Sequence, residues 1–400
     1  MTDAAITGVG LLTPAGDGRA ESWRRVCAGE PAAALHRSPH GTFVVGRVPE
    51  FDAGRLGEAR RWKPDRAGQF ALLAAREALD DAGLDPAEWD GDRVAVLVGS
   101  GTAGAETYEH YLPLLDTAPE DVPPLALPSS LANSPAALVS MAFGARGTSA
   151  VVNTACASGA TALAVACDML ALGRCDVVLV GGTEAGLTPY HLRGFDRLGA
   201  LSRRYEDPLG ASRPFDAQRD GFLIAEGAGF LVLERPEHAA ARGARVRARI
   251  VGHGSASDAH HAVAPHPRGT GIAAAVDDAL RDAGLQRRDI QHVNAHGTST
   301  PRGDAIESAA LARAFTHRPS VTSTKGVTGH LMGAAGAVEA ALTTLSLQKG
   351  VVPPTANLTT PGPGIEVDVS GTRRTARIDA ALSLSVGFGG HNVALVLAAA

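Results

Sequence analysis

Apolar runs bounded by glycine alternate along the chain with segments of helical periodicity. The runs Val94–Val98, Val151–Ala155 and Val177–Val180 predict buried strands. Segments with helical spacing, such as 70–84 and 156–173, lie between the runs. This alternation predicts an α/β fold.

The pattern of the first half of the chain returns in the second half. The segments FALLAAREALDDAGL (70–84) and DRVAVLVGSGT (92–102) are similar to IAAAVDDALRDAGL (272–285) and DIQHVNAHGTST (289–300). A period of half the chain length indicates a duplicated domain. We therefore expect an N-terminal half over 1–240 and a C-terminal half over 241–400, with the boundary near 235–249.

The duplication also predicts how the two halves meet. We expect them to pack sheet against sheet, so that equivalent loops face one cleft. Each half is expected to close with a hairpin, over 221–234 in the first and in LSLSVGFGGHNVALVL in the second. The proline-rich segment 116–128 is the strongest candidate for an excursion from the repeat.

Composition and charge exclude several classes of protein. With 45% hydrophobic and 20% charged residues the chain has enough apolar side chains for a large core, and its net charge of -5 argues against general nucleic-acid binding. The first residues lack a secretory signal pattern, and Asp168 interrupts the longest mostly apolar stretch, 155–173. We expect a cytoplasmic protein with no membrane span. The four cysteines lack Cys-x-x-Cys spacing, so free thiols are expected.

Cys156 stands where a predicted strand gives way to a predicted helix rich in small residues. Unsatisfied N–H groups at a helix N-terminus favour a thiolate and lower the pKa of a cysteine. Cys156 is therefore a candidate nucleophile. Cys167 and Cys175 lie within or after the same helix and are expected to be inert, and Cys27 has no supporting context.

Two histidines stand at matching places in the second half. His296 follows the strand-like segment IQHVNA, and His330 lies at a loop-to-helix transition in KGVTGHLMGAAGA. Neutral imidazoles there can donate N–H groups to a carbonyl or enolate oxygen. Lys325 and Glu339 are spaced to form a buried pair that orients His330; the alternative is a surface pair of little consequence.

Three weaker signals remain open. GSGTAG (99–104) matches a dinucleotide-binding turn, but the proline-rich sequence after it disfavours that function. His253, His260, His261 and His266 lack the spacing of zinc ligands and are expected to border the cleft. Two basic groups form either a solvated face or a docking site for an acidic partner; they comprise Arg60, Arg61, Lys63 and Arg66, and Arg203 and Arg204.

Taken together, the motifs resemble the β-ketoacyl-acyl-carrier-protein synthases of the thiolase superfamily. The resemblance runs from ITGVGLLTP through VVNTACASGATAL, VNAHGTSTPRGD and KGVTGHLMGAAGAVEA to GFGGHNVALVL. It implies a five-layered αβαβα thiolase fold and an elongating enzyme with a Cys-His-His centre. It also implies a dimer, either a homodimer or a heterodimer with a chain-length-factor-like subunit.

The resemblance assigns roles to these residues. Cys156 would accept the acyl group, His296 and His330 would bind the malonyl thioester and its enolate, and Lys325 and Glu339 would support His330. The backbone amides of Phe388 and Cys156 would form the oxyanion hole, and Phe388 would also act as the gate residue. Thr298 and Thr300 would contact the phosphopantetheine arm of an acyl carrier protein. No bound cofactor or metal is implied.

The implied reaction is a decarboxylative Claisen condensation of an acyl-cysteine with a malonyl carrier, in fatty-acid or type II polyketide assembly. A CoA thiolase without decarboxylation and a partner subunit of a ketosynthase heterodimer are the alternatives. Leu384 and Val386 replace an Asn and a Phe that elongating fatty-acid synthases often have, and segment 105–135 is unfamiliar. These departures favour a specialised, polyketide-like role.

Overall fold

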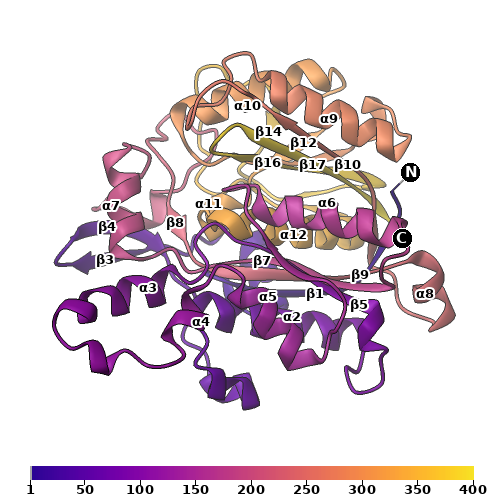
Figure 1. The fold of residues 1–400 in the computed structure, drawn as a ribbon. Coiled ribbons are helices and arrows are strands. Elements are labelled where there is room, and N and C mark those ends of the chain that lie inside the picture. Colours follow the sequence, from indigo (N-terminus) through magenta and orange to yellow (C-terminus); the bar gives the residue numbers. More distant parts are fainter. Residues whose placement is uncertain (1) are drawn as a thin grey trace.

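The computed structural model describes residues 2–400. Two helices at the centre of the molecule lie between two layers of strands (Figure 1). These central helices are α6 (Ser158–Ala171) and α12 (Ala335–Lys349), one from each half of the chain. The outer helices are α2 (Arg66–Ala82) and α5 (Ser134–Phe143) below, and α9 (Thr270–Ala283) and α10 (Pro301–Ala314) above. The result is the five-layered αβαβα thiolase fold that was predicted.

The two strand layers have the same internal order, which confirms the duplication. The first layer runs, in spatial order, through β1 (Ala4–Thr13), β9 (Gly227–Glu234), β7 (Val177–Glu184), β5 (Val94–Gly99) and β6 (Ser149–Val152). The second runs through β10 (Ala248–Ser257), β17 (His391–Ala399), β16 (Ala380–Gly387), β11 (His292–Asn294) and β12 (Ser320–Thr322), and ends at β14 (Asp368–Val369). Antiparallel pairing of β1 with β10 joins the two layers.

The expected packing of sheet against sheet is wrong, because α6 and α12 separate the layers. Their small residues allow the two helices to approach closely. A Cβ placed on Gly159 would lie 2.7 Å from the backbone nitrogen of Ala337, and one on Gly336 would lie 2.7 Å from that of Ala160. The central layer is therefore thin, and the strand ends of both halves come near each other.

The hairpin expected over 221–234 is also wrong. Ile224–Ala225 forms β8, which pairs with β4 (Gly41–Gly46) beside β3 (Ala34–Ser38) in a separate three-stranded sheet, whereas β9 inserts between β1 and β7. Gly227, the first residue of β9, has a φ of 142° and lies so close to Leu12 that a side chain would collide with the Leu12 carbonyl oxygen. The hairpin predicted at the C-terminus is confirmed as β16–β17.

The first half carries an excursion that the second half lacks. It includes α3 (Ala105–Tyr111) and α4 (Ala126–Ser130), which project beside the three-stranded sheet in Figure 1. The predicted excursion over 116–128 falls within it. Several large apolar side chains of this segment are exposed: Tyr108, Leu112, Leu115, Leu125, Leu127 and Leu131.

The remaining α-helices are α1 (Arg19–Ala28), α7 (Pro189–Arg197), α8 (Pro236–Ala241) and α11 (Lys325–Thr328). Among the short strands, β2 (Gly16–Asp17) pairs with β1, and β13 (Val351–Val352) pairs with β15 (Arg374–Thr375). No helix within residues 2–400 combines the length and the apolar composition needed to cross a bilayer.

Candidate active site

The two halves of the chain share one cavity of about 380 Å³ at their adjoining strand ends. All the residues predicted to touch substrate line it: Cys156, His296, Thr298, Thr300, His330 and Phe388. Lys325 and Glu339 are buried next to this cavity without lining it. The predicted cleft between equivalent loops is therefore present.

Cys156 lies in a tight turn between β6 and α6. The strand ends at Val152 and the helix begins at Ser158, so both predicted boundaries were two or three residues too close to the cysteine. Ala155 has a positive φ of 51°, and Ser158 holds the turn by accepting a hydrogen bond from the Thr154 amide at 2.9 Å and donating one to the Ala155 carbonyl at 2.6 Å. The turn places Cys156 just before the helix, in the wall of the cavity.

The expectation of a lowered pKa for Cys156 is wrong for this structure. Burial raises the pKa of the thiol to about 12. The positive charge of Lys325 and a hydrogen bond from the backbone N–H of Phe388 act in the opposite direction. The cysteine is only 4% exposed, so the loss of water outweighs the groups that favour a thiolate. The resting nucleophile is a protonated thiol.

The loop after β16 lies directly against the cysteine turn. A Cβ on Gly387 would lie 2.6 Å from the Thr154 carbonyl oxygen and 3.3 Å from the Cys156 nitrogen, so only glycine allows this approach. The amides of Cys156 and Phe388 thus belong to adjoining backbone segments. The Phe388 ring lies in the cavity wall, 6.1 Å from the ring of Phe195.

The two imidazoles lie side by side and are neutral. Their ring centroids are 5.2 Å apart, with an angle of 87° between the ring planes. Burial, followed by the charge of Lys325, lowers the pKa of both His296 and His330 well below the ordinary value. Nδ1 of each ring is buried without a hydrogen-bond partner. Each ring can therefore act as a neutral N–H donor, as expected from the sequence.

Backbone hydrogen bonds fix His330. Its amide donates to the Leu223 carbonyl at 2.7 Å, and its carbonyl accepts from the Ala225 amide at 2.9 Å. The ring of Phe222 packs edge-on against the imidazole at 5.4 Å. The segment that was mistaken for half of a hairpin therefore positions this histidine.

The Lys325–Glu339 pair is present and buried, and the surface alternative is excluded. Nζ of Lys325 also donates a hydrogen bond of 2.6 Å to the carbonyl of His296. This bond holds the backbone of the other histidine, His296, and among the described residues no hydrogen bond joins the pair to His330. Burial and the charge of Lys325 lower the pKa of His330, and the second effect agrees with the predicted influence of the pair on that imidazole. Burial raises the pKa of Glu339, and Lys325 opposes this effect.

Two carboxylates on α10 hold the loop of His296 and were missed in the sequence. Glu307 accepts hydrogen bonds from the amides of His296 at 2.6 Å and Gly297 at 2.7 Å, and Asp304 accepts one from the Ser299 amide at 3.1 Å. Burial raises the pKa of Glu307 to about 7. The sequence position of both carboxylates could have indicated this role, because they lie in the helix that directly follows HGTST.

Another buried carboxylate, Glu184, links the two halves. It ends β7 and accepts hydrogen bonds from the amides of Gly101 at 2.9 Å, Thr102 at 2.8 Å and Gly333 at 2.8 Å. Burial raises its pKa. The Gly101 and Thr102 amides of GSGTAG thus bind an internal carboxylate and are not free to bind a phosphate.

The side chains of the two basic groups differ in exposure and in their ion pairs. Arg60, Arg61 and Lys63 are exposed, whereas Arg66 is paired at 2.6 Å with buried Glu226. In the second group, Arg203 lies 3.1 Å from Asp196 and Arg204 lies 4.0 Å from Asp220. Arg66 and Arg204 are therefore the members that are least available to a partner, since their side chains are 26% and 25% exposed.

Val263, Ala264 and Pro265 line the active-site cavity, so the segment that carries His260, His261 and His266 borders it as predicted. The prediction is wrong for His253, which lies in β10 with its Nε2 3.1 Å from Asp168. The rings of His260 and His266 are 5.0 Å apart. Within residues 2–400 no group of three or more histidine, cysteine or acidic side chains is arranged to hold a metal ion.

Comparison with known proteins places the chain in one family. The family model for the β-ketoacyl synthase N-terminal domain matches residues 1–239, and that for the C-terminal domain matches residues 247–359. The chain is 39% identical over 400 residues to the 3-oxoacyl-[acyl-carrier-protein] synthase 2 of Synechocystis sp. and 40% identical over 403 residues to that of Vibrio cholerae. These alignments cover 98% of this chain and 96% and 97% of the relatives.

Solved structures agree with this placement. A β-ketoacyl synthase from Burkholderia phymatum superposes with a TM-score of 0.93 at 34% identity and full coverage of both chains. A type II polyketide ketosynthase, solved with its acyl carrier protein and bound to the hexaketide, gives 0.91 at 32%, and the ishigamide ketosynthase/chain length factor gives 0.90 at 32%. Each covers 100% of this chain, which covers 99% of theirs. The chain belongs to the β-ketoacyl synthase family.

Proposed function

We propose that the protein is an acyltransferase that joins a Cys156-bound acyl group to a malonyl group by decarboxylative Claisen condensation. The observation that carries this function is the convergence of one thiol and two neutral imidazoles on a single cavity between the halves. A thiol can hold an acyl group, and neutral N–H donors stabilise an enolate without protonating it.

The first half-reaction transfers the acyl group. The sulfur of Cys156 bonds to the acyl carbonyl carbon, the bond to the carrier thiol breaks, and that thiol leaves with the proton that Cys156 gives up. Because the resting thiol is protonated, this exchange releases no net proton. The amides of Cys156 and Phe388 would donate to the oxyanion that forms during transfer.

The second half-reaction forms the carbon–carbon bond. The malonyl carboxylate leaves as CO₂, and its electron pair becomes the enolate of the thioester, whose oxygen accepts hydrogen bonds from His296 and His330. The enolate carbon attacks the acyl carbonyl, the bond to Cys156 breaks, and the sulfur leaves as a thiolate that takes up one proton from solvent water. Lys325 and Glu339 act by holding His296 in place.

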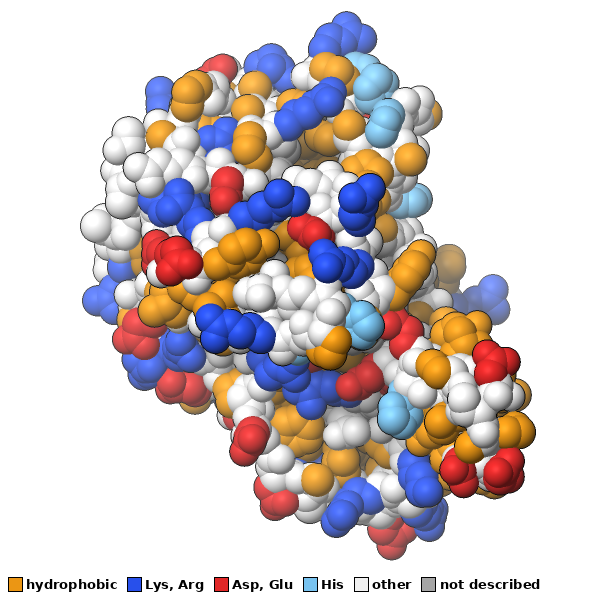
Figure 2. All heavy atoms as spheres, turned by 90° about the vertical axis from the view of Figure 1, so that its left-hand side faces the viewer, with side chains coloured by type: hydrophobic (Ala, Val, Ile, Leu, Met, Phe, Trp, Pro, Cys, Tyr) orange, Lys and Arg blue, Asp and Glu red, His pale blue; other side chains and the backbone are white. Residues whose placement is uncertain are grey.

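We further propose that an acyl carrier protein delivers both substrates on a phosphopantetheine arm. The side chains of Thr298 and Thr300, 3.0 Å apart in the cavity wall, would contact that arm. The face that carries α7 shows positive side chains gathered across its middle (Figure 2), and Arg203 is exposed in the segment after α7. An acidic carrier would be attracted there.

The carbon–carbon bond formation requires no bound metal or nicotinamide in this proposal, because the thiol, the imidazoles and the backbone amides supply every polar group that it uses. A second subunit, either another copy or a chain-length-factor-like chain, would cover the apolar excursion. The cytoplasm stays the predicted location.

The direct test is product analysis with an acyl carrier and a malonyl carrier. We expect a carrier-bound β-keto product two carbons longer and one CO₂ per product, both lost in Cys156→Ala. His330→Ala should release less CO₂ from malonyl carrier. Turnover of acetyl-CoA without malonyl carrier would instead indicate a thiolase, and a chain that forms no acyl-enzyme would indicate a partner subunit.

A further inference from the structure

Glu184, at the end of β7, is completely buried and lies where the two halves of the chain meet. Besides the three backbone amides described above, the hydroxyls of Ser100 and Thr102 donate hydrogen bonds to it, at 3.2 Å in the case of Ser100. Each carboxylate oxygen accepts from at least one backbone amide, so a proton on either oxygen would compete with an amide N–H. The bonds therefore favour the ionised carboxylate, although burial opposes its charge.

One of these bonds holds the turn that follows His330. Residues 331–334 lead from the histidine to α12, and Glu184 accepts a hydrogen bond from the amide of Gly333 in this turn. Met332, just before it, has a φ of 48°, a left-handed conformation that strains a residue with a side chain. A charge-assisted hydrogen bond is of the same order of strength as this strain. The carboxylate can therefore keep the turn in its strained conformation.

The turn after His330 fits tightly against the first half of the chain. A Cβ placed on Gly333 would lie 2.4 Å from the backbone nitrogen of Gly101 and 2.6 Å from Oε2 of Glu184. The turn after β5 and the turn after His330 therefore meet backbone to backbone, and the carboxylate accepts from the amides of both. A weaker acceptor at this position would let the two turns separate.

A shift of this turn would reach the catalytic cavity. His330 and Met332 both line the cavity, and Met332 packs with Cys156 in one buried cluster. The backbone of His330 is held on one side by hydrogen bonds to β8 and to the residue before it. Glu184 supplies the hold on the other side, three residues later.

We propose that Glu184, as an ionised carboxylate, is a positioning residue for His330: it holds the turn after this histidine against the first half and keeps the imidazole where it meets the malonyl thioester. This inference rests on the proposed function, in which His330 takes part in decarboxylation and not in transfer of the acyl group to Cys156. Glu184 does not line the catalytic cavity. It therefore acts through His330 and does not touch substrate.

Glu184→Gln tests this role. The amide side chain has one acceptor oxygen in place of two and carries no charge, so it leaves at least one of the three backbone amides unpaired and weakens the other bonds. We expect CO₂ release from malonyl carrier to fall at least about tenfold, while the rate at which a short acyl carrier modifies Cys156 changes less than about twofold. CO₂ detection and intact-mass analysis of the full protein measure the two rates. Equal losses in both rates would overturn the inference.

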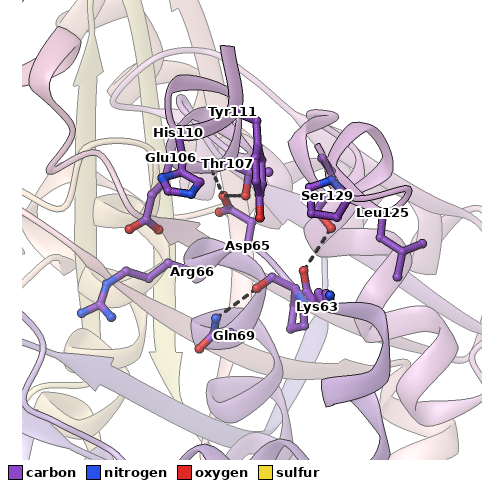
Figure 3. A pocket seen from close by; sticks show the side chains of 13 residues that line it. Lys63, Asp65, Arg66, Gln69, Glu106, Thr107, His110, Tyr111, Leu125 and Ser129 are labelled. Atoms are coloured by element: carbon purple, nitrogen blue, oxygen red, sulfur yellow. Dashed lines mark hydrogen bonds between the residues drawn. The ribbon is translucent and has the colours of Figure 1, made fainter. Parts of the chain in front are cut away.

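Asp65→Asn is the matched control. Asp65 is also buried and also accepts from backbone amides and a threonine hydroxyl: the amide of Ala67 at 2.9 Å, and the amide and hydroxyl of Thr107 at 3.1 Å and 2.8 Å (Figure 3). It lines a hollow along α3 outside the catalytic cavity. This variant should keep the wild-type ratio of CO₂ release to acylation. A ratio that falls equally in Asp65→Asn and Glu184→Gln would overturn the inference, because it would reflect a general loss of order.

The charge of Glu184 gives a second readout, which a loss of packing alone would not produce. Burial is the largest cause of the raised pKa of the Cys156 thiol, and the negative charge of Glu184 adds to it. Glu184→Gln should therefore speed alkylation of Cys156 by iodoacetamide at a fixed pH at least about threefold. Cys167, buried in α6, should stay unmodified because the fold is intact. An alkylation rate equal to that of wild type would indicate a neutral carboxyl and overturn the proposal.

The outcomes separate this inference from the proposed function. A wild-type protein that releases no CO₂ from malonyl carrier, even when Cys156 is acylated, would overturn the proposed function itself. CO₂ release at the wild-type level in Glu184→Gln would overturn the inference alone. Glu184→Asp, which keeps the charge on a shorter side chain, serves if Glu184→Gln does not fold; it should slow CO₂ release without speeding alkylation, and wild-type CO₂ release would again overturn the inference.

Discussion

At the scale of single residues, the thiol of Cys156 is subject to opposing influences. Burial is the largest and favours the neutral thiol, whereas Lys325 and the Phe388 amide favour the thiolate. The sequence indicated the strand-to-helix junction but not how deeply the sulfur would be buried. A junction of this kind is therefore not sufficient to predict an ionised cysteine.

The raised pKa predicts how alkylation of Cys156 depends on pH. Since the thiolate is the reactive form, and its fraction rises tenfold per pH unit below the pKa, the iodoacetamide rate constant should rise about tenfold per unit between about pH 7 and 10. Intact-mass analysis against the Cys156→Ala variant measures this rate. A rate that levels off near neutral pH would instead support the lowered pKa expected from the sequence.

The buried ion pair predicts a clear order of stabilities. Lys325→Met leaves the carboxylate of Glu339 buried without a counter-charge and should lower the free energy of unfolding by roughly 3 to 5 kcal/mol. The double variant Lys325→Met/Glu339→Leu removes both charges and should recover part of that loss. Chemical denaturation monitored by circular dichroism checks the order; a double variant less stable than Lys325→Met would contradict it.

At the scale of elements, the crossing of α6 and α12 controls the site. Cys156 precedes α6 and His330 precedes α12, so the spacing of these two helices sets the spacing of nucleophile and imidazole. Gly159 and Gly336 lie at the closest approach. The small residues that the sequence offered as a packing signal thus have a direct consequence for catalysis.

Gly336→Ala should therefore impair both stability and activity. The added methyl group would collide with the backbone of Ala160, and the resulting shift should cost roughly 1 to 3 kcal/mol and slow condensation. Gly194→Ala, in α7, is the matched control, because no atom lies within 4 Å of its added methyl group. Thermal unfolding and turnover check the pair. Equal effects of the two variants would contradict the account.

The local pattern of apolar residues and glycines predicted helices and strands better than it predicted which strands pair with each other. The central helices, the catalytic turn and the C-terminal hairpin follow from periodicity and glycine placement. The assignment of β8 to the small sheet could not be predicted, because it depends on pairing with β4, far away in sequence. The same reason applies to Glu184, whose amide partners come from both halves.

At the scale of the whole molecule, duplication explains why one half supplies the nucleophile and the other the imidazoles. Both halves have the same strand order, so β6 and β12 occupy equivalent places and the loops after them meet. The repeat in the sequence was sufficient to predict this cleft. It was not sufficient to predict the central helical layer, because periodicity identifies helices without indicating which face of a sheet they cover.

The exposed apolar side chains on the excursion predict association with a second subunit. Leu127 is 70% exposed, and an exposed apolar patch of this kind is typical of an interface. Leu127→Glu should lower the sedimentation coefficient of the purified protein, because it places a charge in the contact. Leu209→Glu, at a leucine that is 53% exposed on another segment, is the control. Identical sedimentation of wild type and both variants would contradict this prediction.

Intact-mass analysis after incubation with an acyl carrier tests whether Cys156 holds the acyl group before condensation. We predict that the wild-type protein gains the mass of one acyl group, that peptide mapping places this group on Cys156, and that malonyl carrier then removes it with release of CO₂. An unmodified wild-type protein, or an acyl group that persists at the same level in Cys156→Ala, would contradict this prediction.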